Sequence, residues 1–464
     1  MNPKPHVESV FWVPITARPL DRSRIKRLLK TEWKKFSKTT EGSEEEMERA
    51  CEPIPLGCTS SFQHWDPYPI SFTNAEGAYL FDCDGRKMLD LSMGFGAMLV
   101  GHLHPYVVKE ITRALSQGTL FVAPSPISSE AATRLCTRFN LDQVRFTNSG
   151  SEATMCAVRL ARVVSGKNGI LKLEGGYHGT YDPFQVSCKP PVEEAGPEDA
   201  PTPHCDNLGL VTGDVFVVPY NNLECLEREL ESHGDKISCF ILEPVMQNIA
   251  LVLPDEGYLE GVRTLCTRHD VILIFDEVKT GLTAGPQGAA VRCNVEPDLI
   301  CLAKSIGGGV PVGAFGGKKE IMDAITDGRF PHCGTFNGNP IAMAGIRAVD
   351  EVCTPEALEK AESLNKQVLL KIKEIIQQHD LPAQITGFGV KGCVTWSMDP
   401  IRNYRDYKRS DFEVAELHWL WMINRGIVTP PGLDEQWLIS LQHGQEEADM
   451  VIEDFRSFAE ALRS

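Results

Sequence analysis

The sequence predicts an α/β protein with a large domain, built on a mostly parallel sheet with helices on both faces, and a small α+β domain formed by the N- and C-terminal segments. Three observations predict this fold class. Strand-like and helix-like segments alternate between residues 105 and 350. Apolar runs in this region end in charged groups, as buried parallel strands do where they leave the core. After residue 350 the order changes to a helix, short strands and a final helix.

Composition favours small molecules as partners. The chain has 464 residues, 42% of them hydrophobic, which is enough for two to three domains of roughly 150 residues each. Its 46 basic and 63 acidic residues give a net charge of −17, which argues against nucleic acid or an anionic membrane surface. The 15 cysteines include no CxxC pair. We therefore expect free thiols, a cytoplasmic location and no membrane-spanning segment.

Residues 1–52 are expected to form an N-terminal helical arm. A basic amphipathic stretch, RIKRLLKTEWKKF, is followed by an acidic one, EGSEEEMER, and both are typical of solvated helices. A basic helix can also bind a membrane or a partner protein. Because the acidic run follows at once, a surface helix or an arm against a second subunit is the favoured interpretation.

Residues 53–104 are assigned to the N-terminal part of the small domain. The stretch IPLGCTSSFQHWDPYPI is rich in proline and aromatic residues and predicts an irregular segment that roofs a pocket. The run GAYLFDCDGRKMLDL, with a central Asp-Gly pair, predicts a hairpin at residues 77–91. His102 and His104 could suggest a metal site, but no further ligand cluster accompanies them, so a turn that leads into a helix is favoured.

Residues 105–350 are assigned to the large domain and residues 351–464 to the C-terminal part of the small domain. The strand-like runs VRFTN, ILKLEGG, ISCFILEP, VILIFDE and DLICLAK alternate with helix-like segments, which predicts a parallel sheet with helical crossovers. Residues 189–207, rich in proline and acids, predict a surface loop. The motif GFGVKG at 387–392 is a literal G-x-G-x-x-G, but a strand-like run follows it, so it is not a dinucleotide fingerprint.

Two charged residues end apolar runs in the predicted sheet, Asp276 after VILIF and Lys304 after DLICLA. Ligands of open α/β sheets bind at this edge. A lysine there, partly screened from water, can act as a free amine toward a carbonyl. Lys304 is therefore the candidate Schiff-base residue, with Asp276 as an acid expected two strands away.

The segment RFTNSGSEATMCAVRLAR, at 145–162, predicts a strand, a turn of small residues and a helix. Ser149, Gly150 and Ser151 would present N–H groups and hydroxyls at the helix N-terminus, where a phosphate binds well. A plain capping box, with Ser149 or Ser151 placed before Glu152, is the alternative, and this motif alone does not decide between the two.

Further polar groups are expected at the same edge. Tyr177 and His178 lie between glycines, Glu243 closes the run ISCFILE and is followed by Asn248, and Thr335 precedes a helix in HCGTFNGNP. Together these groups require a phosphorylated, flat, aldehyde-bearing cofactor with a basic ring nitrogen. Pyridoxal 5'-phosphate meets every requirement.

Within that interpretation, Asp276 would hold the pyridine nitrogen protonated, so that the ring accepts the electrons released when a bond to the substrate α-carbon breaks. Lys304 would bind the aldehyde and, once displaced, move the proton.

These motifs resemble the class III (ω-type) aminotransferases of fold type I, the PLP-dependent transferase fold, and within that group glutamate-1-semialdehyde aminomutase and the β-amino-acid transaminases. The similarity runs from about Pro55 to Phe458, through GAYLFDCDG, VRFTNSGSEAT, EGGYHG, LEPV, LIFDEV, SIGGGVPVGAFGG and GTFNGNP. It implies an obligate homodimer. The roles that it implies are phosphate binding by Ser149, Gly150 and Ser151, ring stacking by Tyr177, contact with the ring hydroxyl by Asn248, pairing with the pyridine nitrogen by Asp276, packing on the opposite ring face by Val278, the Schiff base by Lys304, and contact with the phosphate of the partner subunit's cofactor by Thr335.

The departures from the family pattern concern the substrate. The semialdehyde aminomutases bind a substrate carboxylate with an arginine in the roof segment, where this chain has Gln63. The β-amino-acid transaminases use two other arginines, where this chain has Ser60 and Pro431. Neither glutamine nor serine supplies the charge of a bidentate arginine. We therefore expect a primary substrate that is not held by a carboxylate in the family manner.

The roof segment also bears on the acceptor. Its aromatic character, with Trp65 beside Phe62, His64 and Tyr68, fits an apolar or aromatic acceptor. Arg402 or Arg425 could instead supply a cation from elsewhere in the chain.

The expected reaction is transfer of an amino group from an amine or amino-acid donor to a carbonyl acceptor. An internal amino shift of the aminomutase type, racemisation and decarboxylation use the same cofactor contacts and stay open as alternatives. A binding protein that keeps the fold without catalysis is disfavoured by the intact Lys304 and Asp276.

Overall fold

The computed structural model describes residues 9–206, 209–430 and 436–463. This part of the chain forms two compact units. Unit 1 comprises residues 105–358 and 401–408, and unit 2 comprises residues 9–104, residues 359–400 and the chain from residue 409 onward. Each unit is thus assembled from stretches that are separated in the sequence. The finer division into four segments, with boundaries at residues 52, 104 and 350, stays a prediction.

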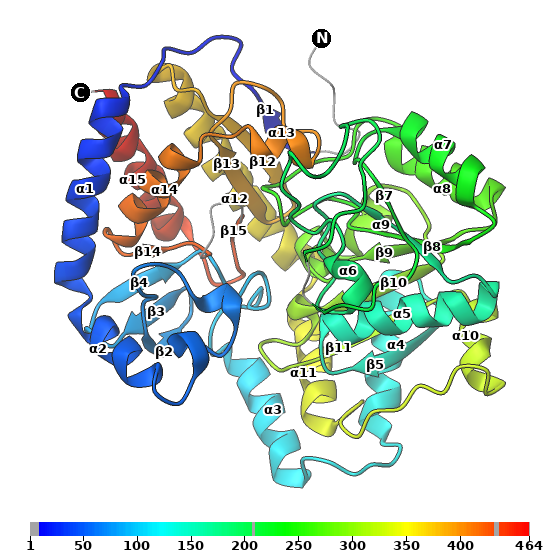
Figure 1. Cartoon of the computed structure of the whole chain (residues 1–464). Helices are drawn as coiled ribbons and strands as arrows, with labels where there is room; N and C mark the ends of the chain where they lie inside the picture. The colour runs from blue at the N-terminus through cyan, green and yellow to red at the C-terminus, as the bar shows by residue number, and fades with distance from the viewer. Residues whose placement is uncertain (1–8, 207–208, 431–435, 464) are drawn as a thin grey trace. The chain divides into compact units, whose positions relative to one another are not determined.

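Unit 1 is built on a seven-stranded sheet with the order β5-β11-β10-β9-β8-β6-β7 (Figure 1). The strands are β5 (Gln143–Thr147), β6 (Gly169–Leu173), β7 (Val215–Val218), β8 (Ile237–Leu242), β9 (Ile272–Asp276), β10 (Leu299–Ala303) and β11 (Gly313–Gly317). Strands β6 to β10 pair in parallel, which confirms the predicted sheet. Strand β11 was not predicted, and it is antiparallel to both β10 and β5.

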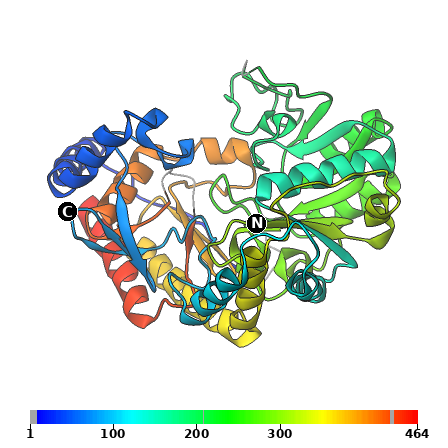
Figure 2. The same cartoon turned by 90° about the horizontal axis from the view of Figure 1, so that it is seen from below.

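Helices cover both faces of this sheet. The described helices of unit 1 are α3 (Pro105–Gln117), α4 (Pro126–Phe139), α5 (Gly150–Ser165), α6 (Asp182–Gln185), α7 (Leu223–His233), α8 (Tyr258–Arg268), α9 (Gly288–Arg292), α10 (Lys319–Thr326), α11 (Pro340–Val352) and α13 (Tyr404–Lys408). Helix α5 runs across the strands (Figure 2) and buries Ala153, Ala157 and Ala161 completely. These small residues, spaced by four, form one helix face and allow a close approach to the sheet. The crossover through α5 leads from β5 to β6, whereas the crossovers through α7 and α8 run along the sheet in the opposite direction. Because such connections are right-handed, α7 and α8 lie on the face opposite α5.

Unit 2 contains two four-stranded sheets, β1-β12-β13-β15 and β14-β4-β3-β2. Its strands are β1 (Val10–Trp12), β2 (Phe72–Glu76), β3 (Tyr79–Asp82), β4 (Lys87–Asp90), β12 (Gln384–Phe388), β13 (Lys391–Thr395), β14 (Ile427–Val428) and β15 (Trp437–Leu438). Its helices are α1 (Arg22–Thr39), α2 (Glu41–Ala50), α14 (Phe412–Ile423) and α15 (Gln445–Arg463), while α12 (Pro355–Gln378) begins in unit 1. Helix α1 packs against α14, and its Phe36 is completely buried in a hydrophobic cluster with Tyr68 and Leu420.

Two local predictions in unit 2, the hairpin and the strand that follows the GFGVKG motif, are confirmed. The predicted hairpin is β3 and β4, joined by a turn in which Gly85 has φ +83°. The G-x-G-x-x-G motif is the hairpin of β12 and β13. His102 bonds Asp90 at 2.8 Å just before α3, and residues 9–206, 209–430 and 436–463 contain no group of three or more potential metal ligands. None of the helices in this described part has both the length and the hydropathy of a membrane span.

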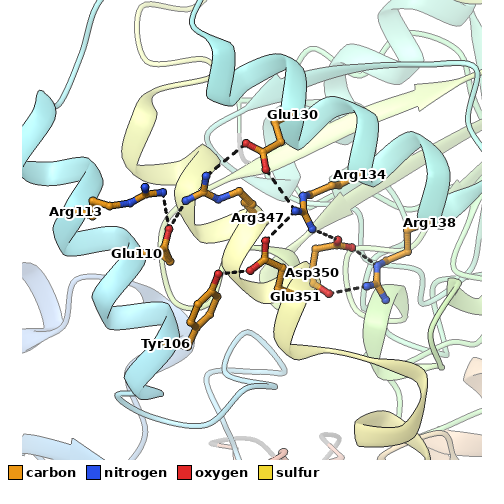
Figure 3. A network of polar contacts seen from close by, with 9 residues as sticks. All are labelled: Tyr106, Glu110, Arg113, Glu130, Arg134, Arg138, Arg347, Asp350 and Glu351. Carbon is orange, nitrogen blue, oxygen red and sulfur yellow. Dashed lines mark hydrogen bonds and ion pairs between the residues drawn. The ribbon is translucent and has the colours of Figure 1, made fainter.

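A network of ion pairs joins α3, α4 and α11 in unit 1 (Figure 3). Arg138 of α4 donates to the Asp350 carboxylate at 2.5 Å and to the carbonyl oxygens of Asp350 and Cys353 at 2.8 and 3.0 Å. Arg134 contacts Asp350 and Glu351 at 2.9 and 2.8 Å. Since the last turn of a helix carries unpaired carbonyls and partial negative charge, Arg138 caps α11 while it links the helices. The other members are Tyr106, Glu110, Arg113, Glu130 and Arg347.

Candidate active site

The carboxyl ends of the parallel strands bring the predicted residues to one edge of the unit 1 sheet. Asp276 is the last residue of β9, Lys304 directly follows β10, and Glu243 directly follows β8. Strands β9 and β10 are neighbours, with Cys301 opposite Asp276. The expectation that two strands separate the acid from the lysine was therefore wrong. The two groups leave adjacent strands at the edge where ligands of such sheets bind.

Lys304 occupies an unusual backbone conformation. Its φ is +49°, in the left-handed region that a non-glycine residue rarely adopts. The chain turns there from β10 into the 3-10 turn Lys304–Ile306, and the Gly307 N–H donates to the Lys304 carbonyl at 3.0 Å. The side chain is half-buried. Strained conformations of this kind concentrate at functional sites, because the surrounding structure has to hold them in place.

Asp276 is buried and held from two directions. Its Oδ2 lies 2.8 Å from Nδ1 of His178, and its Oδ1 accepts a hydrogen bond from the Val278 N–H at 3.0 Å. The His178 side chain is itself completely buried and lies edge-on to Phe184. Its Nε2 atom is buried without a hydrogen-bond partner in the described structure. His178 therefore orients the carboxylate from behind, a role that the sequence did not indicate.

Glu243 organises the two residues that were predicted beside it. Its carboxylate accepts hydrogen bonds from the Asn248 amide at 2.9 Å, from the Gln247 N–H at 3.0 Å and from the Tyr177 N–H at 3.3 Å. Burial raises the pKa of Glu243, while His178, Lys279 and Asn248 oppose that rise. The carboxylate oxygens of Glu243 thus accept hydrogen bonds from neighbouring protein groups and hold Tyr177 and Asn248 in place.

Glu277, next to Asp276, is a buried carboxylate that sequence reasoning missed. It accepts hydrogen bonds from the N–H groups of Ala289 and Ala290 at 2.6 and 2.8 Å, at the start of α9. Burial raises the pKa of Glu277 to about 7, and the two N–H groups act against that rise. The residue therefore anchors α9 behind the site.

Ser149 caps the N-terminus of α5, as in the alternative interpretation, and the Glu152 side chain bonds the N–H of the preceding Asn148. Ser149 Oγ accepts from the Glu152 N–H at 3.2 Å, and Glu152 accepts from the Asn148 N–H at 2.8 Å. Capping does not exclude an anion site, because first-turn N–H groups such as those of Gly150 and Ser151 have no acceptor within the helix.

Glycines bring this first turn close to the rest of the site. A Cβ atom at Gly150 would lie 2.9 Å from Cγ1 of Val278, two residues after Asp276 in the sequence. One at Gly179 would lie 2.7 Å from Cα of Ser151, so the Tyr177 loop also packs tightly on the helix end. The Thr154 hydroxyl of α5 donates to the His178 carbonyl at 2.6 Å. Ser149, Gly150, Ser151, Tyr177, His178, Asp276 and Val278 are thus parts of one packed cluster.

Thr335 lies in the exposed loop before α11. This loop lines a cavity of about 480 Å³ in unit 1, together with Phe121 and Arg145. The bond from Asn148 Nδ2 to Asn337 Oδ1, at 3.0 Å, is a polar link from this loop to the N-terminal end of α5.

The substrate candidates in unit 2 have different environments. Ser60 and Gln63 are exposed, and the Thr59 hydroxyl donates to Gln63 Oε1 at 2.8 Å. Trp65 packs edge-on to Trp419, with ring centroids 4.5 Å apart. Pro431 lies outside the described residues.

The expectation that Tyr68 belongs to the roof is wrong, and the two arginines considered as substitutes have partners within the protein. Tyr68 is 4% exposed and its hydroxyl lies 3.1 Å from that of Thr40, so it belongs to the hydrophobic core and not to a roof. Arg402 forms an ion pair with Asp255 in unit 1, and Arg425 forms one with Glu32 in unit 2 at 3.2 Å. Both arginines are therefore already engaged with carboxylates of the protein.

The residues of the unit 1 site fit pyridoxal 5'-phosphate. The first turn of α5 offers N–H groups that have no acceptor within the helix, and Gly150 lets this turn pack directly against Val278 and Ala303. The buried Asp276 is the carboxylate that a protonated ring nitrogen requires, and Lys304 is the amine that an aldehyde requires.

Comparisons with known proteins agree with this chemistry. Residues 61–411 match the family model Aminotransferase class-III. The glutamate-1-semialdehyde 2,1-aminomutase of Methanothermobacter thermautotrophicus is 34% identical over 424 residues, which is 91% of this chain and 100% of the relative.

Solved structures extend the likeness to the fold. An ω-transaminase from Sphaerobacter thermophilus matches with a TM-score of 0.87 and 30% identity, over 91% of this chain and 98% of that one. A glutamate-1-semialdehyde-aminomutase from Pseudomonas aeruginosa PAO1, in complex with PMP, matches with a TM-score of 0.88 and 26% identity, over 96% and 99%. The chain therefore belongs to the class III aminotransferases, enzymes of fold type I that depend on pyridoxal phosphate.

Proposed function

We propose that this enzyme transfers an amino group from an amine or amino-acid donor to a carbonyl acceptor, and that its primary substrate is not bound through a carboxylate. The observation that carries the proposal is the exposed, uncharged Gln63 at the place where the resembling aminomutases have an arginine. The ion pairs of Arg402 and Arg425 support it, since moving either guanidinium to a substrate would leave Asp255 or Glu32 without its partner.

Each residue of the unit 1 site has a role in this reaction. Bound pyridoxal phosphate supplies an aldehyde that condenses with amino groups and a protonated ring that accepts electrons. Lys304 would hold the cofactor through its amine and, as a free amine, would move the proton at the substrate α-carbon. Asp276 keeps the proton on the ring nitrogen, and His178 and the Val278 N–H hold Asp276 in position.

The remaining residues bind and orient the cofactor. The first turn of α5, at Ser149, Gly150 and Ser151, binds its phosphate. Tyr177 stacks on the ring and Val278 packs on the opposite face. Asn248 approaches the ring hydroxyl. Glu243 holds both Asn248 and the Tyr177 main chain by hydrogen bonds.

The proposal includes a homodimer in which Thr335 contacts the phosphate of the partner subunit's cofactor. Its support is the apolar surface around that loop, where Phe121, Val122 and Phe336 are 49%, 74% and 59% exposed. Exposed patches of large apolar side chains commonly mark protein interfaces. A cytoplasmic location completes the proposal, with its support in 15 cysteines that are all free thiols.

A second candidate is an aminomutase, which moves the amino group within one molecule. Its support is the name of relatives, since three curated proteins that match over 85% to 91% of this chain are glutamate-1-semialdehyde 2,1-aminomutases. The two activities separate by product, because a transaminase releases a carbonyl compound from the amino donor and an aminomutase does not.

A matched pair of donors tests the substrate proposal. The donors 1-phenylethylamine and β-phenylalanine differ by one carboxylate, and each is followed by the spectral change of the bound cofactor and by the ketone or keto acid released. We expect the amine to react at least as well as the amino acid. The Gln63→Arg variant should shift the ratio toward the amino acid, while Gln63→Leu should not.

Three results would count against the proposal. Preference for the amino acid that is lost in Arg402→Met or Arg425→Met would assign the carboxylate to one of those arginines. Isomerisation of glutamate 1-semialdehyde without a released carbonyl product would favour the aminomutase. A protein that shows no visible absorption with added cofactor, or keeps it in Lys304→Ala, would remove the catalytic interpretation; Lys371→Ala, on the surface, is the control.

A further inference from the structure

A side-chain hydrogen bond connects the residue before the N-cap of α5 to the loop before α11. Asn148 immediately precedes Ser149, and its Nδ2 donates to Oδ1 of Asn337 at 3.0 Å. The same Nδ2 donates to Oε2 of Glu152 at 3.2 Å, and the Asn148 N–H donates to that oxygen at 2.8 Å. Asn148 is therefore fixed by α5 on one side and by Asn337 on the other.

The chemistry of Glu152 determines which way the two amides point. A carboxylate only accepts hydrogen bonds, so the side-chain atom of Asn148 that faces Glu152 must be its NH2 group. That group has two hydrogens, and the second one points to Asn337, which must then present its oxygen. Reversing either amide would place two donors or two acceptors face to face.

Asn337 is itself held tightly in its loop. A Cβ atom at Gly334 would lie 2.4 Å from its Nδ2, so the main chain passes directly against this amide. On the other side, Nδ2 lies 3.5 Å from Nε2 of His332, and the Ser128 hydroxyl donates to the adjacent Gly338 carbonyl at 3.2 Å. Burial lowers the pKa of His332 to about 4, so its ring brings no charge to the loop at neutral pH.

We infer that Asn337, acting through Asn148, is a positioning residue for the phosphate cradle at Ser149, Gly150 and Ser151. The inference rests on the proposed function, in which this turn binds the cofactor phosphate. Without the Asn337 side chain, Asn148 keeps its bonds to Glu152 in α5 and loses its bond to the loop before α11. The N–H groups of the turn then lose part of their alignment with the phosphate oxygens.

The test compares two ligands that differ only in the phosphate group. Dissociation constants of pyridoxal phosphate and of pyridoxal are measured by fluorescence on the full-length enzyme freed of cofactor, in wild type, Asn148→Ala, Asn337→Ala and the double variant. We expect Asn337→Ala to weaken pyridoxal phosphate about three- to tenfold, as loss of one hydrogen bond allows, and to leave pyridoxal unchanged. The double variant should bind pyridoxal phosphate no more weakly than the weaker-binding single variant, because the two substitutions break the same hydrogen bond.

Asn339→Ala is the matched control. Asn339 lies in the same loop and caps α11 by accepting from the Ala342 N–H at 2.9 Å, without a contact to Asn148. It should lower the melting temperature and leave the ratio of the two dissociation constants at the wild-type value. A ratio that is unchanged in Asn337→Ala, or equal losses for both ligands, would overturn the inference. So would effects of the two single substitutions that add in the double variant, since Asn337 would then act by another route, such as Thr335.

The same measurements separate this inference from the function on which it rests. If wild-type enzyme binds pyridoxal as tightly as pyridoxal phosphate, the phosphate cradle itself is absent, and the proposed function fails. If wild type discriminates strongly and Asn337→Ala discriminates equally, only the role of Asn337 fails.

Discussion

Asp454, on α15, is a buried carboxyl group of unit 2, and neither of its oxygens has a hydrogen-bond partner among the described residues. It is 7% exposed. Burial raises its pKa to about 7, and the nearby Glu32 carboxylate adds to that rise, while Arg425 and Lys35 oppose it. Glu32 already takes hydrogen bonds from Arg425 and Asn424. The charged form of Asp454 is therefore poorly compensated in the folded protein.

This burial predicts a stability that falls as pH rises. Between the usual value of about 4 and the folded-state pKa of about 7, the folded protein binds a proton that the unfolded chain lacks. Unfolding then releases it, so the free energy of unfolding decreases by up to about 1.4 kcal/mol per pH unit through that window. The Asp454→Asn variant should show a flatter dependence than wild type in urea titrations from pH 4.5 to 7.5.

The exposed Asp449 on the same helix supplies the control. Asp449→Asn removes one carboxylate and leaves the buried group in place, so its curve should run parallel to that of wild type. Parallel curves for wild type and Asp454→Asn would contradict the assignment.

At this scale the sequence predicted the chemistry of the site better than its supports. Lys304 and Asp276 could be found because each ends an apolar run, a local signal. The contact of His178 with Asp276 joins residues that are 98 positions apart, and no local pattern contains that information. Tyr68 misled because aromatic residues in an irregular segment pack into a core as readily as they line a pocket.

Among the elements, α11 is held at its C-terminal end by ion pairs and hydrogen bonds from α4. Arg138 reaches its C-terminal end with bonds to a carboxylate and to two carbonyls that the helix leaves unpaired (Figure 3). The Arg138 side chain is 14% exposed and that of Asp350 is 16% exposed, so solvent screens the pair only in part. The N-terminal end of the same helix follows the Thr335 loop.

Arg138→Ala should therefore destabilise the protein by about 3 kcal/mol, because it leaves the Asp350 carboxylate and the helix carbonyls without their partner. The free energy of unfolding from urea titrations measures the loss. Arg113→Ala is the comparison within the network, since Arg113 is 52% exposed and pairs with Glu110 alone, and it should cost below about 1 kcal/mol. Equal losses would mean that capping of α11 contributes nothing.

The strands of unit 1 were predictable where they are apolar and parallel. Strand β11 has the sequence GAFGG, which lacks the branched residues that mark strands, and only its neighbours make it one. Strand β11 runs antiparallel to β10 because the connection between the two strands is short. The nine residues between Ala303 and Gly313 are too few for the helical crossover that a parallel strand requires, so the chain returns antiparallel.

For the whole molecule, the proposed dimer predicts that two inactive variants rescue each other. Lys304→Ala removes the lysine from a subunit's own site, and Thr335→Ala removes a phosphate contact from the partner's site. A mixed dimer then contains one site with both residues intact. Unfolding and refolding an equal mixture should restore activity to about a quarter of wild type, since half of the dimers are mixed and each has one such site.

The alternative arrangement gives a different result. If Thr335 serves its own subunit, the mixed dimer has no intact site, and activity stays at the level of the separate variants. A monomer in sedimentation at working concentration would contradict the dimer directly.

The discontinuous make-up of the units has a consequence for synthesis of the chain. Strand β1, at the start, pairs with β12, and residues 401–408 complete unit 1 only after most of unit 2 has been made. Neither unit is encoded by one continuous piece of the gene. During translation, early apolar strands are therefore without some of their final neighbours: unit 1 is completed only when residues 401–408 have been made, and unit 2 only when its last helix has emerged.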